Sequence, residues 1–204
     1  MPKTDDVLPA RPTRGRMAGK ALVINIFGGP GSGKTTLAAR LFSEFKERGV
    51  EAAQPEEHAK LAIWSGQPWL LDEQVVLLGR TWETLHALSD KVDVIIVDSP
   101  ILLCSVYARD REPSAFHSYV AHLHTRTDRL NLLLDRDPDL GYSTNGRREN
   151  AHEALVVDQR IMQGLDAIGE HFVETGRGAG DIERIVAAAR GWLRAREGPV
   201  LDLE

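Results

Sequence analysis

The chain has 204 residues, of which 42% are hydrophobic, and it carries a formal net charge of −5. This length supports one substantial core, so we expect a single domain and exclude a motor or multidomain ATPase. The acidic balance argues against a protein that coats nucleic acid through a broad basic surface, although a local basic channel stays open. The one cysteine, Cys104, excludes an internal disulfide and is typical of a protein from the reducing cytoplasm.

The N-terminal stretch differs in composition from the rest of the chain. Residues 1–19 contain three prolines and four basic residues but few apolar ones. We therefore expect a flexible basic arm over residues 1–19 and one folded domain over residues 20–204. The arm could touch DNA, but a solvated tail is the simpler interpretation. Because no signal stretch and no run of membrane-spanning length is present, we expect a soluble, cytoplasmic protein without membrane contact.

A glycine-rich motif lies between an apolar run at residues 21–27 and a helix-like run from Thr36. Residues 28–35 read Gly-Gly-Pro-Gly-Ser-Gly-Lys-Thr, which matches a phosphate-binding P-loop in its usual strand-to-helix setting. Glycines let backbone N–H groups converge on phosphate oxygens, Lys34 reaches the β- and γ-phosphates, and the Thr35 hydroxyl ligates Mg²⁺. The motif predicts binding of ATP and Mg²⁺; the alternative is a plain glycine-rich turn. The expected ligand-binding residues are Gly29, Gly31, Ser32, Gly33, Lys34, Thr35 and Thr36.

Strand-like and helix-like segments alternate along the remaining chain. Strands are expected at residues 50–53, 92–97, 129–134 and 171–174, and helices at residues 36–48, 56–64, 72–89, 152–168 and 181–196. Repeated βα units predict a parallel sheet covered on both faces by helices. The expected fold is therefore an α/β P-loop NTPase three-layer sandwich of about five strands, similar to a nucleotide kinase with a lid.

An aspartate ends the apolar run at residues 92–97, where the chain reads Val97-Asp98-Ser99-Pro100. Ligands of parallel sheets bind at the carboxyl ends of the strands, so we expect Asp98 beside the P-loop. There it could hold Mg²⁺ directly or through water, or orient the group that accepts a phosphoryl group. The alternative is an aspartate that caps the following turn.

Two glutamates follow the expected strand at residues 50–53. We interpret Glu57 as a base that accepts a hydroxyl proton from the acceptor of a P-loop kinase. The alternative is that Glu56 and Glu57 only favour a helix N-terminus electrostatically. The sequence leaves open whether Glu57 or Asp98 takes the proton.

An arginine-bearing loop follows the expected strand at residues 129–134. Its turn-rich composition predicts a lid at about residues 136–150 that brings arginines onto the transferring phosphoryl group and excludes water. Arg136 and Arg147 are the best candidates. A solvated surface loop is the alternative.

These motifs, taken in order, resemble a family of bacteriophage P-loop kinases. The resemblance covers about residues 22–174 and rests on the P-loop, residues 57–60 with Trp64 and Gly66, residues 92–100, and Tyr142 with residues 146–147. The best-defined members are the 5-hydroxymethyluracil DNA kinases, which phosphorylate the base hydroxymethyl group in phage DNA during thymine hypermodification.

The resemblance implies a reaction in which ATP and 5-hydroxymethyluracil in double-stranded DNA give ADP and the phosphomethyl base. It assigns Lys34 and Thr35 to phosphate and Mg²⁺, Asp98 to the metal or acceptor, and Arg147 to the lid. Two positions depart from the family pattern, because His58 stands where relatives more often have Tyr, and Glu149 where they tend to have an amide.

The target hydroxymethyl group lies in the major groove, so a DNA kinase must either reach it there or take the base out of the stack; the sequence leaves both routes open. Four aromatic residues could stack on bases, with Arg109 and Arg111 on phosphates, although a place in the core is the preferred interpretation for each. These aromatic residues are Trp64, Trp69, Trp82 and Tyr107. The neighbouring histidines His117, His122 and His124 are expected to be partly exposed helix residues and not a metal site.

Two rival functions share some of these motifs. A kinase for a free nucleoside, nucleotide or nicotinamide riboside would use the same P-loop, glutamate and lid. A nucleotide-switched binding protein or helper ATPase is a less favoured alternative, because the lid arginines and short length point away from it. The sequence gives no oligomeric state.

Overall fold

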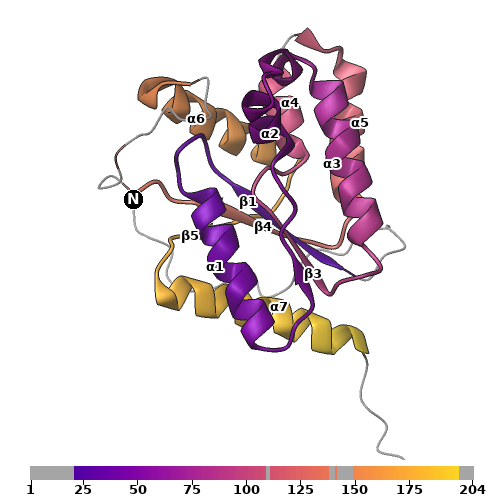
Figure 1. The fold of residues 1–204 in the computed structure, drawn as a ribbon, viewed down its shortest axis with the longest axis vertical. Coiled ribbons are helices and arrows are strands. Elements are labelled where there is room, and N and C mark those ends of the chain that lie inside the picture. The colour runs from indigo at the N-terminus through magenta and orange to yellow at the C-terminus, as the bar shows by residue number, and fades with distance from the viewer. Residues whose placement is uncertain (1–20, 109–110, 138–140, 142–148, 198–204) are drawn as a thin grey trace, which may run out of the picture.

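Five short apolar segments form one parallel sheet at the centre of the protein (Figure 1). The computed structural model describes residues 21–108, 111–137, 141 and 149–197. The strands are β1 (Leu22–Phe27), β2 (Ala52–Ala53), β3 (Val94–Val97), β4 (Arg129–Leu134) and β5 (Val173–Thr175). Their order across the sheet is β2-β3-β1-β4-β5, so the strand that leads into the P-loop is the central one.

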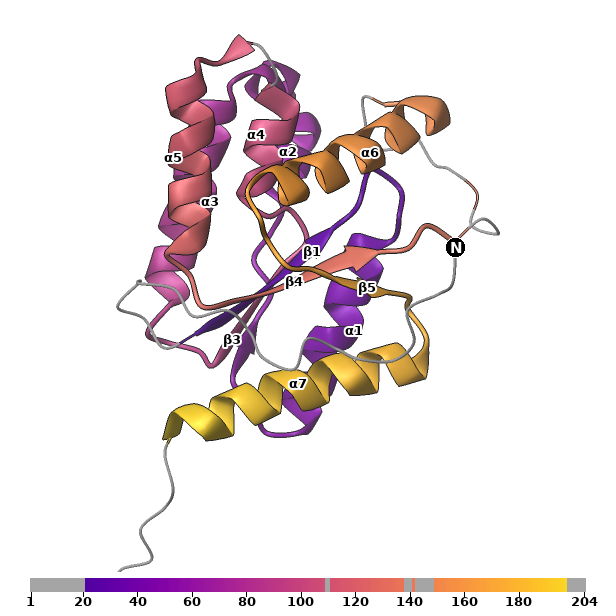
Figure 2. The same cartoon turned by 180° about the vertical axis from the view of Figure 1, so that it is seen from behind.

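Helices cover both faces of this sheet (Figures 1 and 2). Their bounds are α1 (Lys34–Glu47), α2 (His58–Trp64), the 3₁₀ helix η1 (Pro68–Asp72), α3 (Gln74–Leu88), α4 (Leu102–Ala108), α5 (Ser114–Thr125), α6 (Ala151–Ala167) and α7 (Ala179–Glu197). Helices α1 and α7 pack on one face, and α3 to α6 contribute to the core on the other. The expected three-layer α/β sandwich is confirmed.

Alternation of side chains along β1 explains the two cores. Leu22, Ile24 and Ile26 are fully buried against α1 and α7, while Val23 and Phe27 are buried in the opposite core. Because successive strand residues point to opposite faces, a central strand of an α/β sandwich needs apolar residues at both sets of positions. The near-continuous apolar run at residues 21–27 therefore encodes a strand that is covered on both sides.

The register of the sheet brings two predicted motifs together. β1 and β3 are parallel neighbours, with Asn25 opposite Val97. Since both strands run in the same direction, the P-loop after Phe27 and Asp98 after Val97 emerge at the same edge of the sheet.

The sequence predicted all five strands and most helices, with boundaries shifted by a few residues, but it gave no bounds for η1, α4 or α5. The interpretations of residues 1–19, Arg109 and Arg147 lie outside the described residues. Among the described residues, no helix is long and apolar enough to cross a membrane.

A buried polar network lies where β4 begins. The Arg129 guanidinium donates to both carboxylate oxygens of Glu170, and Asn131 Nδ2 donates to Glu170 Oε2 at 2.9 Å. His124 Nε2 lies 3.4 Å from the same oxygen. Burial alone would raise the pKa of the Glu170 carboxyl, but His124 and Arg129 outweigh it and lower that pKa to about 2. His124 is 1% exposed, so the expectation that it is partly exposed is wrong.

Candidate functional site

The loop between β1 and α1 has a backbone that only glycines adopt easily. Gly28, Gly31 and Gly33 have φ angles of 149°, 77° and 97°. Gly33 is the N-cap of α1 in the left-handed region, and a Cβ at Gly28 would lie 2.7 Å from Ser32 Oγ. The glycine spacing thus wraps the loop around the positive end of the α1 dipole, which is a site for an anion.

Ser32 adds a second indication that an anion belongs in this loop. Its hydroxyl oxygen is buried and has no hydrogen-bond partner among the residues that the structure describes. A buried hydroxyl without a partner is unfavourable, so a ligand that supplies acceptor oxygens would satisfy it. The residues present therefore fit the phosphates of a nucleotide.

Thr35 and Asp98 meet as the sequence predicts. Thr35 Oγ1 donates to Asp98 Oδ2 at 2.6 Å, and Asp98 is 4% exposed at the end of β3. A hydroxyl beside a carboxylate offers the oxygen ligands that Mg²⁺ prefers, with phosphate oxygens and water to complete its shell. This pair fits the metal that the P-loop implies.

Lys34 lies among carboxylates. Its Nζ donates to Gly29 O at 3.0 Å, within the P-loop. Burial lowers the pKa of the Lys34 ammonium, while the charges of Glu57, Asp98 and Asp158 raise it. Glu57 follows β2, Asp98 follows β3, and Asp158 belongs to α6. The Lys34 ammonium therefore lies where these three segments come together.

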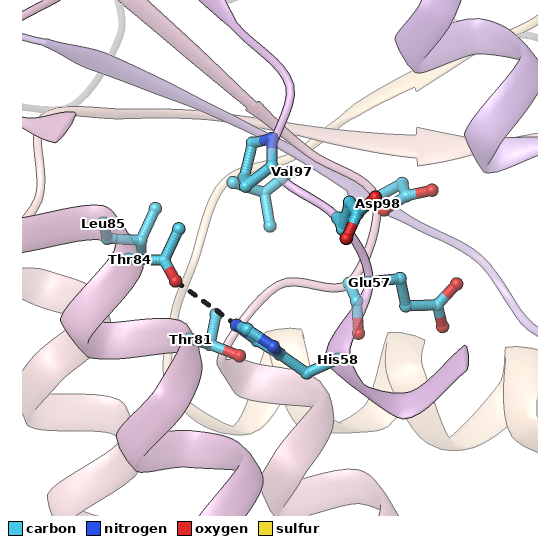
Figure 3. A pocket seen from close by; sticks show the side chains of 10 residues that line it. Glu57, His58, Thr81, Thr84, Leu85, Val97 and Asp98 are labelled. Carbon is cyan, nitrogen blue, oxygen red and sulfur yellow. Dashed lines mark hydrogen bonds between the residues drawn. The ribbon is translucent and has the colours of Figure 1, made fainter. Parts of the chain in front are cut away.

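Glu57 occupies the N-cap position of α2, but its side chain makes no capping hydrogen bond to that helix. It lines a small cavity with Asp98, and Figure 3 shows the two residues next to each other. In the same cavity His58 Nε2 lies 3.3 Å from Thr84 Oγ1. Glu57 also lines the large cavity described below, so its carboxylate borders space that a ligand can occupy.

Arg136 is held against the P-loop by a residue that the sequence did not indicate. Its Nη1 donates to Pro30 O at 3.0 Å, and its Nε and Nη2 donate to Asp158 Oδ2 at 3.0 and 2.8 Å. Asp158 Oδ1 also accepts the backbone N–H of Gly29. A Cβ at Gly29 would lie 2.5 Å from Ala154 O, so this glycine lets α6 pack directly on the loop.

A second arginine lies on the other side of the P-loop. Arg177, in the connection between β5 and α7, donates from Nη2 to Asp137 Oδ2 at 2.8 Å. A Cβ at Gly33 would lie 2.5 Å from Arg177 Nη1, so the guanidinium rests against the start of α1. The signal that could have found Arg177 is its place between two glycines after the last strand.

One large cavity is shared by the P-loop and Glu57. Its volume is about 1200 Å³, and it extends from the P-loop to residues of α2, η1, α3, α4 and α6. Its wall contains Glu57 and the cations Lys60, Arg111 and Arg160, together with apolar residues such as Ile63 and Leu103. Since ligand pockets commonly measure about 300–1,000 Å³, the space suffices for a nucleotide and a second small group.

The structure corrects the placement of two tryptophans. Trp64 and Trp69 are 62% and 59% exposed, so the preferred interpretation as core residues is wrong for both. Trp82 and Tyr107 are partly buried and pack against the core, as that interpretation has it.

Comparison with known proteins assigns most of the chain to one family. A family model described as an AAA domain matches residues 23–184. The chain belongs to this AAA-domain family. The match starts in β1 and ends in α7, so the P-loop, Glu57, Asp98 and Asp158 of this AAA domain all lie within it. A search of curated proteins gave no match.

Two solved structures resemble this AAA domain. The NadR protein in complex with NR is 18% identical with a TM-score of 0.58, and the match covers 86% of this chain and 52% of NadR. The protein APE1195 is 16% identical with a TM-score of 0.46, over 88% of this chain and 98% of its own. The chain thus spans about half the length of the NadR structure. The NadR likeness shows a shared α/β fold.

Proposed function

We propose that this protein is a phosphotransferase that moves the γ-phosphoryl group of ATP to an alcohol. The observation that carries the proposal is the single cavity in which the P-loop residues Lys34 and Thr35 face the same space as Glu57. A nucleotide held by the P-loop would direct its γ-phosphate toward that space, where a second substrate also has room.

Each residue has a role in this reaction. Lys34 and the loop amides would hold the β- and γ-phosphates, and Thr35 and Asp98 would hold Mg²⁺, which would neutralise charge on the phosphate oxygens. Arg136, and Arg147 from the lid at about residues 136–150, stabilise the charge that spreads over the transferring group. The folded domain at residues 20–204 would thus contain the complete donor site.

Glu57 is the group we assign to the hydroxyl proton. Asp98 already accepts the Thr35 hydroxyl at 2.6 Å and is buried, whereas Glu57 borders the cavity and does not cap α2. As the acceptor oxygen bonds to the γ-phosphorus, the bond to the bridging oxygen of ADP breaks and the proton moves to Glu57.

The acceptor we propose is the hydroxymethyl group of 5-hydroxymethyluracil in double-stranded DNA, a step in thymine hypermodification. The motif resemblance supports this choice. The second candidate is a free nucleoside, nucleotide or nicotinamide riboside, which is favoured by a cavity of about 1200 Å³ walled by several helices and by the fold shared with NadR, solved with NR. A nucleotide-switched ATPase would not need a carboxylate facing an acceptor space.

A transfer assay separates these reactions. The protein is incubated with Mg²⁺ and γ-labelled ATP, and is offered a duplex with 5-hydroxymethyluracil, a matched thymine duplex, and a panel of nucleosides that includes nicotinamide riboside. We expect label on the modified duplex alone. Label only on free nucleosides would refute the DNA acceptor, and label released only as inorganic phosphate would refute phosphoryl transfer.

A further inference from the structure

Two tryptophan side chains on the short segment from α2 to η1 are exposed to solvent. Trp64 ends α2 and Trp69 lies in η1, and their exposed fractions are 62% and 59%. Indole rings of this size are usually covered in a folded protein, and exposed ones gather at binding surfaces. We call Trp64 and Trp69 the tryptophan pair.

The segment that carries the tryptophan pair is fixed by its backbone. Gly66 has a φ of 73°, which allows the turn, and Gln67 N donates to Ala62 O at 2.8 Å. The buried residues Ala62 and Leu70 anchor its two ends, each 2% exposed. Aromatic rings on a fixed turn lose little conformational freedom when a flat ligand stacks on them.

The same segment is flanked on both sides by residues that line the large cavity. Lys60 and Ile63 of α2 line the cavity just before Trp64, and Leu71 and Asp72 of η1 line it just after Trp69. A polymer whose reacting group enters the cavity would therefore pass close to the tryptophan pair. A free nucleoside would be held inside and would need no such surface.

Cations accompany the aromatic rings. The Lys60 ammonium lies 4.6 Å from the centroid of the Trp64 ring. Arg111 lines the cavity, pairs with Asp72 at 2.5 Å, and leaves half of its side chain exposed. Aromatic faces next to cations are the two components that proteins use to bind single strands, one for the bases and one for the phosphates.

We propose that the tryptophan pair is a stacking surface for unpaired DNA bases that flank the base being phosphorylated. This inference rests on the DNA form of the proposed function. A base that leaves the duplex to enter the cavity exposes the faces of its neighbours, and an indole ring replaces the stacking that those bases lose. Because the net charge is −5 and Arg111 already pairs with Asp72, this surface would bind DNA mainly by stacking, with the Lys60 ammonium beside Trp64 as its nearest cation.

Binding and transfer are tested separately. Fluorescence anisotropy measures the affinity of the full chain for a labelled single-stranded oligonucleotide, and the transfer assay compares a modified oligonucleotide with the best free nucleoside. Trp64→Ala and Trp69→Ala should each weaken oligonucleotide binding about tenfold, the loss of about 1.4 kcal/mol, which lies in the range for one stacked base. Trp64→Phe should retain most of the affinity.

Tyr119→Ala is the matched control, since Tyr119 is 55% exposed on α5 and does not line the cavity. Unchanged oligonucleotide affinity in both tryptophan variants would overturn the proposal even if the protein proves to be a kinase. A concentration-dependent dimer that both variants abolish would also overturn it, because the pair would then be a self-association surface. Tryptophan-dependent binding without phosphoryl transfer would uphold the surface and refute the proposed function instead.

Discussion

Asp158 is the residue whose removal tests how the P-loop is held. Its carboxylate accepts Arg136 Nε and Nη2 at 3.0 and 2.8 Å and the backbone N–H of Gly29. Asp158→Asn keeps the shape of the side chain and one acceptor oxygen, but it removes the charge and turns an N–H₂ group toward the guanidinium. We expect Arg136 to lose its fixed position while the Gly29 contact persists in part.

The size of the effect follows from the exposure of the pair. Both side chains are 24% exposed, so the ion pair is intermediate between a surface pair and a buried pair. A surface pair contributes about 0.2–1 kcal/mol to stability, and breaking a buried pair costs about 3–5 kcal/mol. We therefore expect Asp158→Asn to lower the free energy of unfolding by about 1–2 kcal/mol, and Tm by about 2–8 °C for a chain of this length.

The assay combines stability and turnover. Chemical denaturation and thermal melting measure the first, and kcat and KM for ATP measure the second. If Asp158 positions Arg136 for the transferring group, Asp158→Asn should lower kcat about tenfold with little change in KM, and Asp158→Glu should restore part of it. Asp166→Asn, an exposed aspartate on the same helix, is the control. Equal stability and kcat in the two asparagine variants would refute the reasoning, and a change in stability alone would leave Asp158 a structural role only.

Three further changes probe the donor site and the buried network. Glu57→Gln should lower kcat at least about a hundredfold with unchanged ATP binding, because a proton acceptor is lost; near-normal single-turnover transfer would exclude Glu57 as the base. Thr35→Ala should raise the Mg²⁺ concentration needed for half-maximal activity about tenfold, and an unaltered Mg²⁺ titration would remove Thr35 from the metal shell. Glu170 has a folded pKa of about 2 against 4.5 in the unfolded chain, so the unfolded chain binds more protons in this window. Stability should fall by at most about 3 kcal/mol as pH drops from about 5 to 2, and a denaturation series in which Glu170→Gln shows the same slope would contradict this.

The sheet and the P-loop could be predicted from the sequence because both are specified by residues that are adjacent in the chain. Apolar runs that end in Gly28 and Asp98 specify both a buried strand and the edge at which it ends. Helix α4 escaped prediction because its first residues, Leu102 to Cys104, are all buried, so no polar face gives a helical period.

Contacts between segments that are distant in the sequence could not be predicted from such local patterns. Asp158 and Arg177 meet the P-loop only after the sheet has ordered its strands. Asp158 has no distinctive neighbour in sequence, and the glycines on either side of Arg177 mark a turn but do not show that it reaches the P-loop. Likewise, hydrophobicity assigns Trp64 and Trp69 to a core, and only the folded structure shows that both rings are exposed.

Two neighbouring residues, Arg136 and Asp137, form ion pairs with two later segments of the chain that lie next to the P-loop. Arg136 pairs with Asp158 of α6, and the next residue, Asp137, pairs with Arg177 before α7. Each guanidinium next to the loop thus already has a carboxylate partner before a nucleotide arrives. A single small anion must compete with these aspartates for the arginines, whereas a triphosphate also gains the loop amides and Lys34. Paired arginines should therefore favour a ligand that contacts the whole loop at once, so we expect a nucleoside triphosphate to bind in preference to free phosphate.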